Sequence, residues 1–262
     1  MKPVTPACRT VALFAASLLC FVDAGCAEEI RVMTSGAFTA PYLQVIPQFE
    51  RTTHNKIVTA YGASMGNAPN SIPMRLQRGE PVDVVILAGD ALDALIKQGK
   101  VVPGSRVDLV RSSIGVAVRA GAPKPDISSV DALKRTLLEA KSIAYSDSAS
   151  GAYLSEEMFQ RLGIADQIRG KCKRIASGPV GAVVARGDAE IGFQQISELL
   201  PVPGIDYVGP LPREVQKVTV FSAGIAVGAK QPDAARVLIK FLASPSVVPA
   251  IKKTGLEPVA SE

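Results

Sequence analysis

The apolar run Val82–Leu87, broken only by Asp83, most constrains what this chain can fold into. Short runs of this kind are typical of strands that are buried on both faces of a parallel sheet. Strand-like segments alternate with helix-like segments along the rest of the chain. This alternation predicts an α/β fold with a largely parallel sheet and helices on both of its faces.

The individual elements are predicted from apolar spacing and from the Ser, Asp, Gly and Pro residues at their ends. Strands are expected at residues 30–34, 56–60, 82–87, 114–118, 142–145, 173–176, 190–193 and 217–227. Helices are expected from Pro41, around Ile72 and Leu76, from Asp90 to Gly99, and at residues 130–138, 151–162, 180–186, 233–242 and 246–253. Asp90 and either Ser128 or Ser129 are expected as N-caps.

Two long apolar stretches, near residues 108–118 and 216–227, are candidates for strands that cross between two lobes. We therefore expect one lobe to contain residues 28–111 with 217–262, and the other to contain residues 112–216. Open α/β sheets bind ligands beyond the carboxyl ends of their strands. The expected binding site is therefore a cleft between the lobes.

The first 27 residues have the pattern of a secretory signal peptide. Lys2 and Arg9 come before the apolar run 11–22, and the small residues Gly25 and Ala27 follow it. This run is too short to be read as a membrane-spanning helix. We expect cleavage after Ala27, a periplasmic location, and no membrane insertion once the signal is removed.

Loss of this leader would leave a single cysteine. Cys8, Cys20 and Cys26 precede the expected cleavage site, and only Cys172 remains. We therefore expect no disulfide within the mature chain and interpret Cys172 as structural rather than reactive. A lipoprotein-type cleavage before Cys26 is the alternative, although Asp23 stands where a large aliphatic residue would be expected.

The charge of the mature chain favours a small anionic ligand. Removing Lys2 and Arg9 from 29 basic residues, and Asp23 from 24 acidic residues, leaves 27 and 23, a net charge of +4. The basic residues are scattered and form no stripe with interleaved aromatic residues, which argues against nucleic acid as a partner.

Three segments place hydroxyl-bearing residues where an expected strand gives way to a helix. They are Ser35-Gly36, residues 60–66 with Ser64, and residues 144–151 with Ser150. Free backbone N–H groups at the start of a helix, together with the helix dipole, attract anions. Ser and Gly also serve simply as caps and turns. Three such junctions in one α/β chain favour a shared anion site.

Neither a His-dependent triad nor a metal site is indicated. His54 is the only histidine, and it lies in a turn at the amino end of an expected strand, away from the cleft. No cluster of His, Cys and Asp has metal-ligand spacing. A base would have to be a carboxylate, Tyr, Lys or Ser. Asp147 and Tyr153 are candidates, although Asp147 could cap the following helix and Tyr153 could belong to the core.

Several motifs resemble those of the periplasmic molybdate-binding-protein group of ABC-importer solute receptors. They are residues 35–38, 79–86, 90–92, 150–153 and 187–192. The resemblance extends over essentially all of the mature chain, and Gly-x-Pro-x-Asp-Val at residues 79–84 is its most specific part. It implies the two-lobed type II periplasmic binding-protein fold, with two crossover strands and an interlobe cleft.

The chain departs from this group at the residues that would face a ligand. Residues 34–38 and 63–66 differ from the usual motifs, Ser150 stands in place of an Ala, and Gln194 stands in place of a Tyr. Arg75 is close by in sequence, and a guanidinium pairs well with a planar carboxylate. The resemblance thus implies a carboxylate site made by Ser35, Gly36, Ser64, Met65, Arg75, Ser150 and Gln194.

Within this group, the chain is most similar to the aconitate isomerase family. That resemblance implies an allylic 1,3-proton shift on a tricarboxylate, carried out without a cofactor. We expect the protein to be a monomer. The reaction requires donors that hold the carboxylates and one positioned base. The alternative is a substrate-binding protein of an ABC importer, for a small carboxylate or a molybdate-like oxyanion, which would dock on a membrane permease. Because strand side chains alternate, only one of Gln194 and Gln195 is expected to face the ligand.

Overall fold

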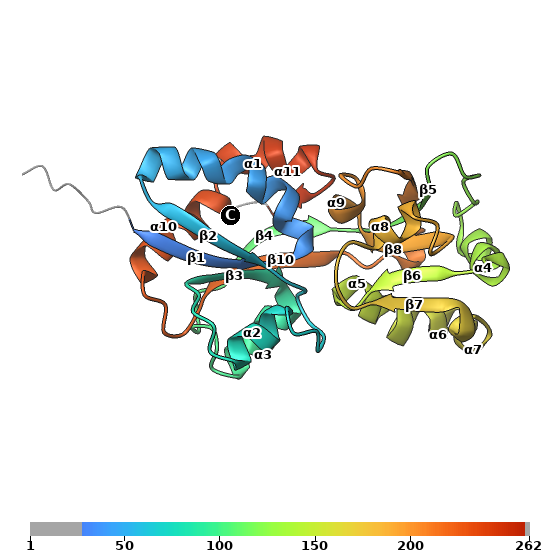
Figure 1. Ribbon diagram of the computed structural model, residues 1–262, viewed down its shortest axis with the longest axis horizontal. Coiled ribbons are helices and arrows are strands. Elements are labelled where there is room, and N and C mark those ends of the chain that lie inside the picture. Colours follow the sequence, from blue (N-terminus) through green and yellow to red (C-terminus); the bar gives the residue numbers. More distant parts are fainter. Residues whose placement is uncertain (1–27, 260–262) are drawn as a thin grey trace, which may run out of the picture.

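The computed structural model describes residues 28–259. It consists of two lobes lying side by side, each built around one mixed sheet (Figure 1). The predicted signal peptide, with Cys8, Cys20 and Cys26, lies outside the described residues.

The sheet of the first lobe takes its strands from both ends of the described chain. Its spatial order is β11 (Glu257–Pro258), β4 (Val107–Ser112), β10 (Thr219–Ile225), β3 (Val84–Ala88), β1 (Glu29–Thr34) and β2 (Lys56–Tyr61). Its helices are α1 (Gly36–Thr53), α2 (Ile72–Gln77), α3 (Gly89–Lys97), α10 (Pro232–Leu242) and α11 (Val248–Lys253). Figure 1 shows α1 and α11 over one face of the sheet and α2 and α3 over the other. The rings of Phe49 in α1 and Phe241 in α10 pack with their centroids 5.4 Å apart.

The second lobe is formed by the middle of the chain. Its sheet has the order β7 (Cys172–Ile175), β6 (Ile143–Ser146), β8 (Ile191–Gln195), β5 (Ile114–Arg119) and β9 (Ile205–Pro210). Its helices are α4 (Val130–Glu139), α5 (Ala149–Tyr153), α6 (Phe159–Arg161), α7 (Ala165–Ile168), α8 (Val180–Ala185) and α9 (Ile196–Leu199). Each lobe has its own large hydrophobic core.

The expectation of a largely parallel sheet is wrong. β1 pairs in parallel with β2 and β3, and β6 pairs in parallel with β7 and β8. However, β10 is antiparallel to β3 and β4, and β5 is antiparallel to β8 and β9. The antiparallel strands adjoin the two places where the chain passes between the lobes. Alternation of strands and helices predicts parallel pairs only where a helix returns the chain to the same sheet.

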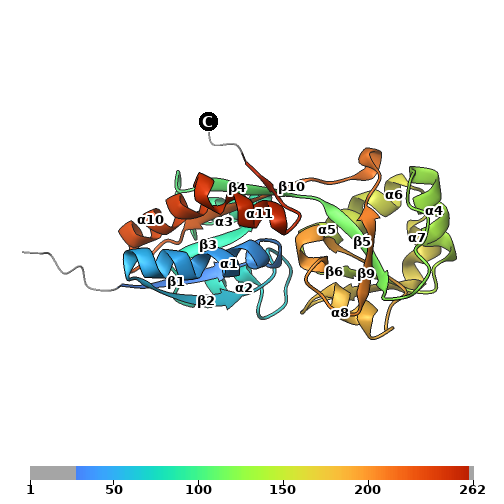
Figure 2. The ribbon, with the colours of Figure 1, turned by 90° about the horizontal axis from the view of Figure 1, so that it is seen from above.

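The two passages between the lobes are joined by the side chain of Gln216. The outgoing chain leaves the first sheet at Ser112 and enters the second at Ile114 (Figure 2). The Ile114 N–H donates to Gln216 Oε1 at 2.9 Å, and Gln216 Nε2 donates to the Ile114 carbonyl at 3.0 Å. The Tyr153 hydroxyl donates to the Val215 carbonyl at 2.8 Å, which fixes the return passage to the second lobe. We propose that residues 28–111 with 217–262, and residues 112–216, are the two folding units that these passages connect.

Several local expectations differ from the structure. α1 begins at Gly36 rather than Pro41 and continues through Pro41 and Pro47. Asp90 lies in the first turn of α3 and is not its N-cap, whereas Ser129 caps α4 by accepting the Ala132 N–H.

Two further differences lie in the second lobe. The helix expected at residues 151–162 contains a π-helical turn at Leu154–Met158. β9 lies between the strands expected at residues 190–193 and 217–227, where the sequence predicted no strand.

Asp83 explains the most specific sequence motif in structural terms. Its side chain is 2% exposed. Oδ2 accepts the Arg31 N–H at 2.8 Å, and Oδ1 accepts the N–H groups of Lys230 and Gln231 at 2.7 and 3.1 Å. One carboxylate therefore connects β1 to the segment that leads into α10, and it satisfies three backbone donors.

No single helix among the described residues is long and apolar enough to cross a membrane. α10 and residues 245–253 meet that test only as a pair bent by 55°. The apolar side chains Leu238, Ile239 and Ile251 of this pair are buried in the first core.

We expect Asp83→Ala to lower the free energy of unfolding by about 3 kcal/mol, because three buried donors lose a charged acceptor. Urea unfolding followed by circular dichroism measures this change. Asp166→Ala is the matched control, since the Asp166 side chain is 87% exposed. The control should change the free energy by less than about 1 kcal/mol. Equal effects of the two substitutions would contradict the role given to Asp83.

Candidate functional site

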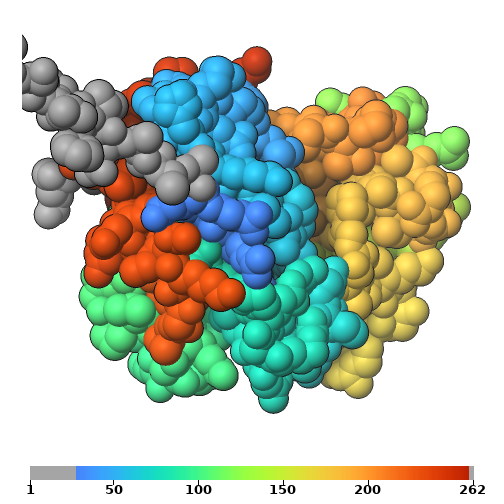
Figure 3. Space-filling model, turned by 60° about the vertical axis from the view of Figure 1, so that its left-hand side comes forward, coloured from blue at the N-terminus to red at the C-terminus, as the bar shows by residue number. Residues whose placement is uncertain are grey.

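A cleft of about 560 Å³ lies between the two lobes. Figure 3 shows the lobes meeting; the first lobe is blue to green, with the orange-red to red carboxyl-terminal part of the chain, and the second lobe is mostly yellow to orange. Residues 35–37 and 61–64 line the cleft from the first lobe, and residues 146–150, 175–179, 194–195 and 197–198 line it from the second. The strands β1, β6 and β8 all end at this cleft.

The first predicted junction lies on the cleft wall. Ser35 follows β1 and is the N-cap residue of α1, but its side chain makes no capping hydrogen bond. Its N–H donates to the Ile86 carbonyl at 2.8 Å. Its Oγ is buried and has no hydrogen-bond partner among the described residues. Ser35 and Gly36 thus leave a free hydroxyl beside the positive end of an 18-residue helix.

The second predicted junction is a loop rather than a direct step from strand to helix. β2 ends at Tyr61 and α2 begins only at Ile72. Ser64 nevertheless lines the cleft, where its Oγ accepts the Ala88 N–H at 3.0 Å. Its hydroxyl proton remains available to a ligand. Met65 instead packs against the first hydrophobic core.

The third predicted junction starts a helical segment at Ala149. Ser148, Ser146 and Ser150 all line the cleft. Ser148 Oγ accepts the Ser64 N–H at 3.3 Å, which connects the two lobes across the cleft. Ser150 Oγ lies 3.1 Å from Ser146 Oγ. A Cβ at Gly151 would lie 1.6 Å from the Ser146 carbonyl oxygen, so only glycine allows this close approach.

Both Gln194 and Gln195 line the cleft, contrary to the expected alternation. Gln195 is the last residue of β8 and also the N-cap residue of α9, so the chain turns at this residue and the alternation is lost. Gln194 Oε1 accepts the Val180 N–H at 2.9 Å. Gln195 is 2% exposed, and neither of its side-chain polar atoms has a partner among the described residues. Gln195 is therefore the amide that is free for a ligand.

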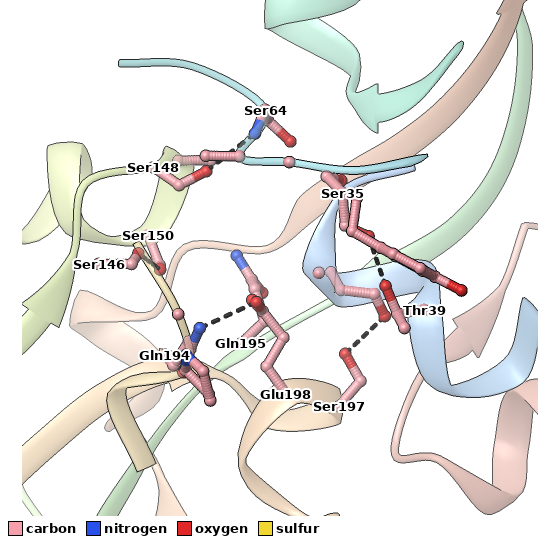
Figure 4. Close-up of a pocket in the computed structure, with 18 of the residues that line it drawn as sticks. Ser35, Thr39, Ser64, Ser146, Ser148, Ser150, Gln194, Gln195, Ser197 and Glu198 are labelled. Carbon is pink, nitrogen blue, oxygen red and sulfur yellow. Dashed lines mark hydrogen bonds between the residues drawn. The ribbon is translucent and has the colours of Figure 1, made fainter. Parts of the chain in front are cut away.

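Glu198 is a cleft residue that the sequence did not indicate. It lies in the first turn of α9 and extends toward the space between Ser150 and Ser35 (Figure 4). Its Oε1 accepts Gln194 Nε2 at 2.9 Å. A Cβ at Gly36 would lie 1.9 Å from the same oxygen, so the carboxyl reaches α1 only because residue 36 is glycine. Burial raises the pKa of the Glu198 carboxyl to about 7.

The other candidate residues differ in where they lie. Asp147 lines the cleft, with Oδ1 ion-paired to Arg174 Nε at 2.5 Å. Arg75 was expected beside a ligand but does not line the cleft, because its guanidinium pairs with Glu80 and donates to the Asn70 carbonyl. Tyr153 was a candidate base, but it is buried outside the cleft lining and donates to the passage between the lobes.

The cleft contains few ionisable groups. Its titratable lining residues are Tyr61, Asp147 and Glu198, and no Lys, Arg or His of residues 28–259 lines it. His54 is exposed at the carboxyl end of α1, and burial raises the pKa of the Cys172 thiol. Within the described part of the chain, no group of three His, Cys, Asp or Glu residues is arranged to bind a metal ion.

We expect Gln195→Met to raise the free energy of unfolding by about 1 kcal/mol, because it replaces two buried unpaired polar atoms with apolar ones of similar size. Gln194→Met is the matched control and should lower it by about 1–2 kcal/mol, because the Val180 N–H loses its acceptor. Urea unfolding of both variants tests this contrast. Destabilisation by Gln195→Met would show that this amide has a partner in the folded protein.

Comparison with known proteins agrees with this architecture. The family model described as bacterial extracellular solute-binding protein matches residues 30–257. An aconitate isomerase of a Pseudomonas species is 48% identical over 233 residues, 89% of either chain. The molybdate-binding protein ModA of Azotobacter vinelandii is 29% identical over 254 residues, which cover 94% of this chain and 95% of that protein.

A solved structure of the Azotobacter vinelandii periplasmic molybdate-binding protein has the same fold. It matches with a TM-score of 0.69 at 22% identity, over 89% of this chain and 100% of that one. The predicted two-lobed type II periplasmic binding-protein fold is thereby confirmed. The chain belongs to the bacterial extracellular solute-binding protein family.

Proposed function

We propose that this chain is a periplasmic aconitate isomerase, which interconverts trans- and cis-aconitate in the interlobe cleft. The observation that carries the proposal is the 48% identity to an aconitate isomerase over 89% of the chain. The signal-like leader and the extracellular family description support export. The reaction is an allylic 1,3-proton shift, which moves a proton and a double bond within one substrate and requires no electron carrier.

The cleft offers neutral hydrogen-bond donors for the carboxylates of such a substrate. Ser35 Oγ and the Gln195 amide are buried and unpaired among the described residues. The Ser64 hydroxyl retains a free proton, and Ser150 lies on the opposite wall. In the transition state, negative charge spreads from carbon onto the carboxylates. Fixed donors around the carboxylates stabilise that charge without reorganising.

The size of the cleft is compatible with a tricarboxylate. A volume of about 560 Å³ is within the range of sites for small organic ligands. It is larger than one tetrahedral oxyanion would need. The volume of the cleft therefore supports a carboxylate substrate, which neutral donors would hold because no cationic side chain of the described residues lines the cleft.

The second candidate is a substrate-binding protein of an ABC importer. It is favoured by the absence of any Lys, Arg or His from the lining formed by the described residues. The resemblance to molybdate receptors implies oxyanion binding by neutral donors alone. Under this alternative the ligand is a small carboxylate or a molybdate-like oxyanion, and the partner is a membrane permease.

Incubating the mature protein with trans-aconitate in D₂O separates the two functions. NMR should show formation of cis-aconitate together with deuterium at the allylic carbons. We expect Ser35→Ala to lower kcat/KM about 100-fold, because it removes a donor to the developing charge. Ser128→Ala is the matched control, since Ser128 is exposed and bonds only within its own turn.

Calorimetric titration with trans-aconitate, citrate and molybdate completes the test. A carboxylate site predicts that trans-aconitate binds and molybdate does not. Gln195→Met should weaken trans-aconitate binding at least tenfold, since the amide would lose its hydrogen bonds to the ligand. Tight binding of molybdate, with neither turnover nor exchange of trans-aconitate, would establish the receptor instead.

A further inference from the structure

We propose that Glu198 is the acid–base residue, which takes the proton from one carbon of the substrate and returns it to the other. This assignment rests on the proposed function and identifies the group that the reaction requires. It depends on where the Glu198 carboxyl lies and on how the other ionisable groups of the cleft are engaged.

The position of Glu198 is built by both lobes. α9 brings the side chain into the cleft from the second lobe, and Gln194 Nε2 holds Oε1 at 2.9 Å. From the first lobe, Gly36 leaves the space in which the carboxyl lies. Ser197 Oγ donates to the Ala37 carbonyl at 2.8 Å, which fixes α9 against the start of α1. The carboxyl is thus held beside the free donor Ser35, where a substrate carboxylate would bind.

The remaining ionisable residues of the cleft are less suited to proton transfer. Asp147 is paired with Arg174 at 2.5 Å, which occupies one of its carboxylate oxygens. Tyr61 is 46% exposed at the cleft. Among the described residues, the Glu198 carboxyl has Gln194 as its one hydrogen-bond partner, so Oε2 is free to act on a substrate.

Within residues 28–259, no ionised group of a neighbouring element adjoins the carboxyl. β8, α8 and residues 254–256 packed around α9 contain no titratable side chain. β5 contains only Arg119, at its far end near Gly187. α1 contains Tyr42 in the first core, and Glu50 and Arg51 near its carboxyl end. The protonation of Glu198 is therefore governed by its burial and by the substrate.

The proton transfer balances within the substrate and Glu198. The carboxylate takes a proton from the methylene carbon, and the bonding pair of that C–H bond enters an allylic carbanion stabilised by the substrate carboxylates. The O–H proton exchanges with solvent, and the O–H bond then breaks and delivers a proton, or a deuteron in D₂O, to the far carbon. The electron pair forms the new C–H bond, the double bond moves, and the carboxylate is regenerated.

The pH dependence of the reaction follows from the same residue. Burial raises the pKa of Glu198 to about 7, in the range where one group both accepts and returns a proton. The carboxylate form is the base, so kcat/KM for trans-aconitate should fall as the pH decreases below about 7. A carboxyl that acted only as a protonated donor to the substrate would give the opposite slope.

The test is to measure Glu198→Gln against the unaltered protein. Glutamine has the same size and can accept the Gln194 N–H, so the fold and the cleft should be preserved. We expect kcat to fall about 1,000-fold and methylene exchange of trans-aconitate in D₂O to disappear. Calorimetry should show trans-aconitate bound as tightly or more tightly, since a negative charge beside an anionic ligand is removed. The control Glu156→Gln changes an exposed glutamate outside the cleft and should leave kcat unchanged.

The outcomes distinguish this assignment from the proposed function. If the unaltered protein isomerises trans-aconitate and Glu198→Gln retains turnover, the assignment is wrong and the function stands. Loss of binding together with turnover in Glu198→Gln would make the residue a ligand holder and also overturn the assignment. Loss of turnover in Asp147→Asn, with Glu198→Gln active, would transfer the role to Asp147. Absence of turnover and exchange in the unaltered protein would overturn both proposals.

Discussion

The pairing of Gln216 with both backbone groups of Ile114 fixes how the two halves of the molecule meet. The chain passes between the sheets twice, and this side chain joins the two passages. The passages set the lobes so that the carboxyl ends of β1 and β8 face the same space. A ligand can then be held by residues that are distant in sequence, such as Ser35 and Gln195.

The chemistry of the cleft follows from donors that have no hydrogen-bond partner among the described residues. A buried polar atom without a partner costs stability, and Ser35 and Gln195 carry such atoms at the cleft wall. A chain selected only for stability would pair or replace them, so their retention points to a ligand. Fixed neutral donors also suit a reaction in which charge spreads over carboxylates. Glu198 adds a base whose one hydrogen-bond partner, Gln194, is neutral, and burial raises the pKa of its carboxyl so that it can both take up and release a proton.

The sequence predicted the architecture better than the details of the site. The two-lobed fold was predicted, and Ser35, Ser64 and Gln194 line the cleft, as the sequence led us to expect. Arg75 was misplaced because its partner Glu80 is five residues away, and a local ion pair leaves no distinct sequence pattern. Glu198 was missed because its segment carried no strand or helix signal. The Glu198 carboxyl can reach the cleft because Gly36 of α1 leaves space for it, and this contact between distant residues forms only in the folded chain.

The central claim is that neutral donors at the lobe junction hold a substrate carboxylate beside Glu198. A crystal structure of the protein with trans-aconitate bound tests this most directly. The account predicts carboxylate oxygens within about 3 Å of Ser35 Oγ and Gln195 Nε2, with an allylic carbon next to the Glu198 carboxyl. A ligand whose carboxylates instead pair with Arg75 or Arg174, away from these donors, would contradict it.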